Sequence, residues 1–224
     1  MLYLLFIAPG LLLSIIASLY VRSTFNRYRE VGTSRGRTGA QVAAELLHRA
    51  GVAGVTIEPV EGSLSDHYDP SARALRLSPD VFHGTSISAA GVAAHEAGHA
   101  IQHHAGYSLM GVRQTLVGPA RLGSSLSYFI IAAGMVVNLT AVAWLGVALF
   151  AAVFLFELVT VPVEINASAR ARRALTDLGL VTADEARGVG KVLNAAALTY
   201  IAAMVTSLLT LLYYVLQLTG RRRD

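Results

Sequence analysis

Residues 91–104 read GVAAHEAGHAIQHH and contain the pattern H-E-x-x-H, which indicates more about this chain than any other stretch. Alanine and glycine surround the pattern and proline is absent, which favours a closely packed helix. His95 and His99 are four residues apart, so on a helix both imidazoles lie on one face and could share a metal ion. Glu96 lies beside that face, where a carboxylate could deprotonate a bound water. Two imidazoles do not complete a site, and a chance match is the alternative interpretation.

A third metal ligand has to come from elsewhere, because catalytic zinc usually takes three protein ligands. The metzincin pattern would continue with glycine at 102 and histidine at 105, but the chain has Gln102 and Ala105. The sequence also has no L-D-G segment, which supplies the third ligand in intramembrane site-two proteases. His103 falls one turn beyond His99 and could reach the edge of the site, as a ligand or as a polar neighbour. A carboxylate from a second helix is the remaining solution.

The best candidate carboxylate is Glu164, which directly follows a long apolar run. Ser168 lies four residues further on and would share the helical face of Glu164, so its hydroxyl could hold a ligand imidazole by a hydrogen bond. The alternative is an interfacial glutamate at the end of a membrane span, paired with Arg170 or Arg172. The residues alone leave both interpretations open.

Two motifs that lie far apart occur together in this chain. H-E-A-G-H-A-I-Q at 95–102 is followed downstream by V-P-V-E-I-N-A-S-A-R-A at 161–171. Together they resemble the YugP-type family of bacterial membrane zinc metallopeptidases, and the likeness covers about residues 60–205. The resemblance implies a gluzincin-like site in which His95, His99 and Glu164 bind one Zn²⁺ ion and Glu96 is the catalytic base. The second motif is also distantly similar to HtpX-like and CAAX-type membrane proteases, which have aspartate where this chain has Ser168.

The composition independently indicates a membrane protein. Hydrophobic residues make up 54% of the chain and charged residues 14%, and the mean hydropathy of +0.54 is well above that of a soluble domain. Four apolar segments are long enough to span a bilayer as helices, at about residues 2–21, 122–140, 144–163 and 192–218. We therefore predict a mainly α membrane protein with about four transmembrane helices.

A soluble catalytic region is expected at about residues 22–120, as a small α+β region packed on the membrane face. Thr38 could cap a helix that ends at Gly51, and strands are expected at 55–60 and 74–78. The second strand could bind substrate as an added strand, although an ordinary sheet strand is the simpler interpretation. About eighty soluble residues bury little core alone, so we predict a single domain over residues 1–224.

The distribution of arginine predicts the orientation of the chain. Arginines follow the first and third apolar segments and are absent between the second and third, which predicts a site at the cytoplasmic face. The resemblance to the YugP-type family implies that the membrane is a bacterial inner (plasma) membrane. The basic tail at Arg221–Arg223 would then lie outside, which is the one objection. The net charge of +4 favours anchoring to anionic lipid over nucleic-acid binding, because aromatic residues do not interleave the basic ones. With no cysteine, the chain has neither a disulfide framework nor a thiolate ligand.

These features predict a multi-pass zinc endopeptidase that cuts polypeptides in or beside the lipid bilayer. A zinc-activated water would attack the peptide carbonyl, and Glu96 would act as general base. One alternative is a non-catalytic zinc-binding scaffold, for which Glu96 would have little use. Another is a zinc hydrolase of a non-peptide amide, which the shared metal chemistry leaves open. Tyr200, His103 and Arg170 are the polar groups that could stabilise the oxyanion, and the sequence does not choose among them.

Overall fold

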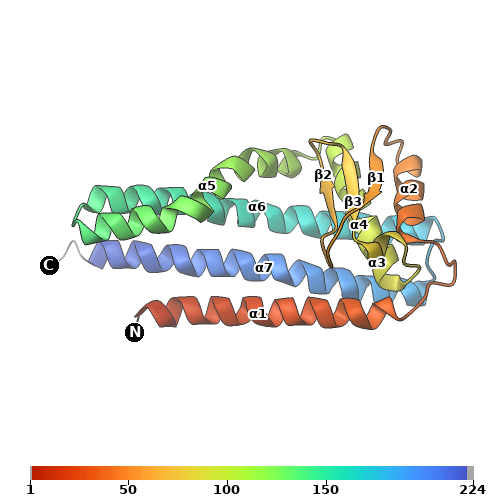
Figure 1. Cartoon of the computed structure of the whole chain (residues 1–224), viewed down its shortest axis with the longest axis horizontal. Coiled ribbons are helices and arrows are strands. Elements are labelled where there is room, and N and C mark those ends of the chain that lie inside the picture. Colours follow the sequence, from red (N-terminus) through yellow and green to blue (C-terminus); the bar gives the residue numbers. More distant parts are fainter. Residues whose placement is uncertain (1, 221–224) are drawn as a thin grey trace. The chain divides into compact units, whose positions relative to one another are not determined.

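The computed structural model describes residues 2–220, so the basic tail at Arg221–Arg223 lies outside the described residues. The chain is mostly helical, with one small sheet (Figure 1). In chain order the elements are α1 (Leu2–Arg29), α2 (Gly39–Arg49), β1 (Thr56–Pro59), β2 (His67–Asp69), β3 (Ala74–Leu77), α3 (Pro79–Phe82), α4 (Ile87–His104), α5 (Ser108–Val136), α6 (Thr140–Asp177) and α7 (Ala183–Gly220).

Four helices of the described part of the chain, α1, α5, α6 and α7, are long and apolar enough to cross a membrane. The predicted fold class, mainly α with about four such helices and a small α+β region, is therefore confirmed. The helices extend beyond the apolar runs that predicted them. α5 begins at Ser108, before the expected 122, and α6 continues to Asp177, past the expected 163. Helical geometry does not require apolar residues, so an apolar run marks the part of a helix that lipid could cover and not its ends.

The chain divides into two compact units, which we describe separately. The first consists of the residues up to Ser18, of Ser108–Pro162 and of the residues from Thr199 onward. The second consists of Leu19–Tyr107 and Val163–Leu198. Every residue of the predicted metal site falls in the second unit.

Small residues allow the helices of the first unit to approach closely. The Oγ1 atom of Thr206 on α7 donates to the carbonyl of Gly10 on α1 over 2.9 Å, and Ser14 lies 3.1 Å from the same hydroxyl. Side chains of this kind are typical of helix contacts within membranes, where close backbone approach and polar pairs replace the hydrophobic drive. The direction of α5 changes along its length in Figure 1, and Pro119 lies inside this helix, where proline removes a backbone hydrogen bond.

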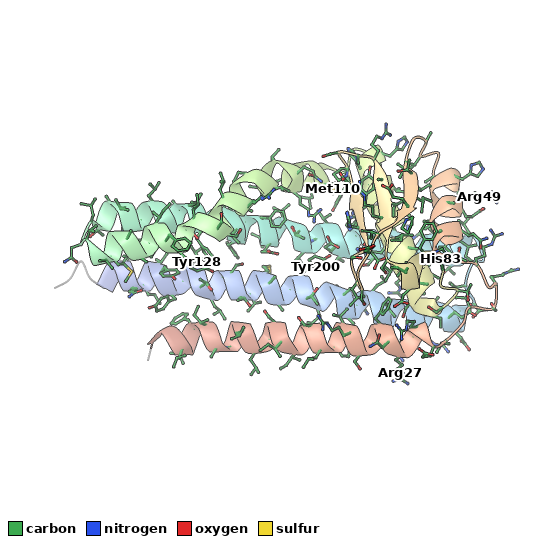
Figure 2. The ribbon with its side chains drawn as sticks, viewed as in Figure 1. Arg27, Arg49, His83, Met110, Tyr128 and Tyr200 are labelled. Atoms are coloured by element: carbon green, nitrogen blue, oxygen red, sulfur yellow. The ribbon has the colours of Figure 1, made fainter. Side chains whose placement is uncertain are left out.

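In the second unit, α2 forms as the sequence predicts. The Thr38 hydroxyl accepts from the Gln41 backbone N–H over 3.2 Å, and the Gln41 side chain accepts from the Thr38 N–H over 3.0 Å, which completes a capping box. The buried face of α2 is apolar at helical spacing and consists of Val42, Ala43, Leu46 and Leu47. At the far end of α2 the Arg49 side chain points away from the ribbon, as does Arg27 on α1 (Figure 2).

The three strands form one sheet with the order β1-β3-β2 (Figure 1). β1 pairs with β3 in parallel, and β2 pairs with β3 antiparallel. The strand expected at 74–78 is therefore the central one, with both edges occupied, so it cannot bind substrate as an added strand, and that hypothesis is wrong. β2, which contains His67 and Tyr68, is a third strand that the sequence pattern does not predict. Three residues that end at Asp69, directly before Pro70, are too few to show a strand pattern in sequence.

α4 is the central element of the second unit and packs against α2, α3 and the sheet. It begins at Ser86, whose hydroxyl accepts from the Ala89 N–H over 3.2 Å. The buried Ser88 donates to the carbonyl of Phe25 on α1 over 2.8 Å, which fixes the start of the helix. Most of α4 is buried on every side, because its alanine and glycine residues let neighbouring backbones come close.

Candidate metal centre

α4 supplies the two histidines and the glutamate of the H-E-x-x-H pattern, and all three are buried. His95 is 8% exposed, Glu96 9% and His99 6%. The imidazoles of His95 and His99 meet edge to face with ring centroids 4.7 Å apart. The spacing of four residues thus places both rings on one face of α4, as the sequence predicts.

The final part of α6, which belongs to the same unit, lies directly against α4. A β-carbon placed on Gly98 would meet the carbonyl oxygen of Ala167 at 3.0 Å and the Ala167 Cα at 3.5 Å. Two helices approach this closely only where one of them has no side chain. Gly98 adjoins His99, and Ala167 lies between Glu164 and Ser168, so this contact sets the separation between the two halves of the site.

The two imidazoles and the Glu164 carboxylate converge on one point. His95 Nε2 lies 3.0 Å from Glu164 Oε2, and His99 Nε2 lies 3.3 Å from the same oxygen. Glu164 is 2% exposed. Within residues 2–220, these three residues form the group of histidine and carboxylate side chains whose ligand atoms all fall within 4.8 Å of one another. The structure thus places the three predicted ligands together, from α4 and α6.

The spacing of these donor atoms fits a zinc ion. Tetrahedral zinc with ligand bonds of about 2.0–2.1 Å separates neighbouring ligand atoms by roughly 3.3 Å. The two nitrogen-to-oxygen distances, 3.0 and 3.3 Å, lie close to that value. Two imidazole nitrogens with one carboxylate oxygen are also a donor set that zinc accepts in catalytic sites. The residues present therefore suit the ion by number, type and spacing.

The second nitrogen of each imidazole is also held. Ser168 Oγ lies 3.1 Å from His95 Nδ1, and Gln102 Oε1 lies 3.0 Å from His99 Nδ1. Contacts of this kind fix the ring orientation of metal-binding histidines. Ser168 thus lies where the sequence predicts. His103 does not join the site, because its Nδ1 lies 2.9 Å from the hydroxyl of Tyr68 on β2.

Glu164 also changes the proton affinity of the site. Burial lowers the pKa of His99, but the neighbouring hydrogen bonds and negative charges, those of Glu164 most, together hold the pKa above its usual value. The negative charge of Glu96 raises it further. A second buried carboxyl, Asp66, accepts hydrogen bonds from the backbone N–H and hydroxyl of Ser78. Burial raises the pKa of Asp66, and the charge of Glu96 adds to the effect.

The three candidates for oxyanion stabilisation belong to different helices. Arg170 is on α6, where its Nε donates to Asn166 Oδ1 over 2.7 Å and its guanidinium lies 6.0 Å from the ring centroid of Tyr107. Tyr200 is on α7 in the first unit, and His103 contacts Tyr68. Arg170 is therefore engaged with Asn166 on its own helix and with the ring of Tyr107.

Sequence reasoning missed Gln102 and Asn166. Gln102 is fully buried and bonds to His99, and its Nε2 donates to Asn166 Oδ1 over 3.0 Å. The signal in the sequence was a polar residue three positions after His99, in a helix that is otherwise rich in alanine and glycine. In the sequence, Gln102 stands out only because it breaks the metzincin pattern.

Comparison with known proteins agrees with this geometry. Residues 3–219 match the family model described as "Putative neutral zinc metallopeptidase". The chain is 42% identical over 216 residues, 96% of each chain, to the protein named "Putative membrane protease YugP" of Bacillus subtilis (strain 168). No solved structure matches the chain. Because the family model matches nearly the full length and the relative nearly its whole chain, this protein belongs to that zinc metallopeptidase family of membrane proteins.

Proposed function

We propose that this protein is a membrane-embedded zinc-dependent endopeptidase that hydrolyses peptide bonds of membrane or membrane-proximal proteins. The observation that carries the proposal is the convergence of His95 Nε2 and His99 Nε2 on one oxygen of Glu164. The family match and the protease name of the Bacillus relative support it.

Three side chains would hold the zinc ion: His95 and His99 through Nε2, and Glu164 through its carboxylate. When bound, zinc lowers the pKa of a water molecule to about 7 and polarises a carbonyl group. Catalytic sites leave one zinc position open, and three protein ligands are consistent with that number. A fourth protein ligand would instead support the scaffold alternative. Within residues 2–220, no fourth histidine or carboxylate joins the group.

Glu96 is the proposed general base. It follows His95 on α4 and is buried beside the convergence point, close enough for its charge to act on His99. Its carboxylate would accept a proton from the attacking water as the oxygen-to-carbon bond forms. The same carboxylate would then donate that proton to the amine nitrogen as the carbon–nitrogen bond breaks. Protons therefore balance with Glu96 returned to its ionised form.

The location of the activity is a further part of the proposal. Glu164 directly follows the apolar run at 144–163, so one of the three ligands lies within the candidate membrane span Thr140–Asp177, at the end of its most apolar part. Arginines after the first and third apolar segments support a cytoplasmic site in a bacterial inner membrane. We propose that the whole chain acts as one metallopeptidase domain, in which Glu164 of α6 completes the site of the catalytic region at about 22–120.

Two substitutions in the purified full-length protein test the proposal, with zinc content and cleavage of a fluorescently labelled unfolded polypeptide both measured. Glu96→Gln should keep zinc and lose cleavage, because it removes the proton acceptor and leaves all three ligands. Glu164→Ala should lose zinc. Full zinc occupancy in Glu164→Ala would refute the choice of third ligand, and undiminished cleavage by Glu96→Gln would refute the mechanism. Zinc binding by a wild-type protein without cleavage would favour the scaffold or the hydrolase of a non-peptide amide.

A further inference from the structure

The side chains behind His99 form a chain of polar contacts that the proposed mechanism does not use. Its members are Gln102 on α4 and Asn166 and Arg170 on α6. We infer that these three are positioning residues that keep a proton on Nδ1 of His99 and so present the lone pair of Nε2 to the metal. The inference rests on the proposed function, because it concerns the same zinc site.

The backbone of α6 fixes the orientation of the Gln102 amide. Gln102 Nε2 lies 2.9 Å from the carbonyl oxygen of Val163. A carbonyl oxygen only accepts hydrogen bonds, so the NH₂ half of the amide has to face it. The other half of the amide, Oε1, therefore faces His99 Nδ1 at 3.0 Å. An amide oxygen only accepts, so His99 Nδ1 is the donor and carries the proton.

Arg170 fixes the same orientation independently from the other end. A guanidinium has only donors, so Asn166 presents Oδ1 to Arg170 Nε over 2.7 Å. That oxygen also receives the second N–H of Gln102 over 3.0 Å. If Gln102 turned over, its oxygen would face the oxygens of both Asn166 and Val163. The oxygens of Val163 and Asn166 can only accept hydrogen bonds, so both disfavour a Gln102 amide turned the other way round. His99 Nδ1 therefore remains the donor to Gln102 Oε1.

Burial makes the chain of contacts decisive. Gln102 is fully buried, so any of its polar atoms left without a partner would carry the full desolvation cost. Solvent water does not reach the Gln102 amide, so it cannot supply the hydrogen bonds that the opposite orientation would lose. The contact from Tyr107, whose ring lies 6.0 Å from the Arg170 guanidinium, adds a further restraint at the far end.

The second histidine is held differently. Ser168 Oγ lies 3.1 Å from His95 Nδ1, and a hydroxyl can either donate or accept. Ser168 therefore orients the His95 ring without choosing which nitrogen carries the proton. The chain from Arg170 to Gln102 acts on His99 alone, so the two imidazoles can be perturbed separately.

The test measures the zinc dissociation constant of the purified full-length protein in detergent, by competition with a zinc-binding dye. Gln102→Leu and Asn166→Leu should weaken zinc binding by about 10–100-fold, the usual effect of removing an outer partner of a metal-binding histidine. Asn166→Asp should stay within about threefold of wild type, because a carboxylate accepts from both Arg170 and Gln102. Melting of the zinc-free proteins, followed by circular dichroism, reports whether each variant folds.

A double-mutant cycle separates positioning from general packing. Gln102→Leu with Asn166→Leu should weaken zinc no more than Gln102→Leu alone, because both break one chain of contacts. Gln102→Leu with Ser168→Ala should multiply the two single effects, because they act on different histidines. Unchanged affinity in both leucine variants, or equal loss in Asn166→Asp and Asn166→Leu, would overturn the inference. A wild-type protein that binds no zinc would instead refute the proposed function. If Gln102→Leu does not fold, the comparison between the two Asn166 variants still decides the question.

Discussion

Gly98→Ala tests whether the close approach of α4 and α6 sets the zinc site. Glycine at 98 lets the two backbones meet, and an alanine β-carbon would lie 3.0 Å from the Ala167 carbonyl oxygen. The contacted atoms of Ala167 belong to the backbone of α6, so no side-chain rotation can relieve the contact. The helices have to separate, and Glu164 then moves away from His95 and His99.

The size of the effect follows from the contact distances. An ordinary non-bonded contact at about 3.5 Å requires the helices to separate by roughly 0.5 Å. Alanine gains about 1 kcal/mol of helix propensity over glycine, whereas overpacking costs about 1–3 kcal/mol. The free energy of unfolding should therefore fall by only about 0–2 kcal/mol. Metal sites need their ligands held to about 0.5 Å, so zinc affinity should fall by about tenfold or more.

The assay pairs zinc affinity with thermal unfolding of the same detergent-purified protein. Gly91→Ala on the same helix is the matched control. Its β-carbon would lie 3.3 Å from Cγ1 of Val189, a side-chain atom that can shift, so zinc binding should be unchanged. Wild-type affinity in Gly98→Ala would refute the reasoning, as would an equal loss in Gly91→Ala.

Three further predictions concern the whole protein. Removing zinc with a chelator should lower the unfolding temperature of the wild-type protein. An ion present at about 1,000 times its dissociation constant stabilises the folded state by about 4 kcal/mol. Glu164→Ala is the control, because its unfolding temperature should not change when the chelator is added. Thr38→Ala should lose the capping box of α2 and about 1 kcal/mol of stability in thermal unfolding, with zinc affinity unchanged. In inside-out membrane vesicles, protease added outside should cut the loop at residues 33–37; cutting only in right-side-out vesicles would reverse the proposed orientation.

Local patterns predicted those parts of the fold that depend on neighbours in sequence. The helix after Thr38 and its buried face follow from a cap and a 3.6-residue period, and the structure has both. β2 was missed because its three residues are too few to show the alternation of a strand, although its partner β3 follows closely in sequence. α6 extends to Asp177, well past the apolar run at 144–163, because polar residues continue the helix where it packs against α4.

The candidate site shows the same division. His95 and His99 follow from their spacing, and Glu164 stood out because a carboxylate directly after an apolar run is unusual. Gln102 and Asn166 could not be found in this way. A buried amide has no fixed spacing relative to a distant helix, so its role depends on which backbone carbonyl lies opposite, here that of Val163. Gln102 and Asn166 belong to the site because of their contacts in the folded protein, which their residue types do not predict.

Two features of α4 therefore control the proposed metal site in different ways. Gly98 sets the distance between helices, so it acts on the separation of Glu164 from both imidazoles at once. Gln102 sets the proton position of one imidazole and leaves the distances unchanged. Because α4 is buried on nearly every side, neither feature can be replaced by water or by a flexible surface group. The small residues of α4, such as Gly98, and the buried amide of Gln102 therefore serve the same end. Both keep the three proposed ligands, which come from two helices, in the positions that a zinc ion needs.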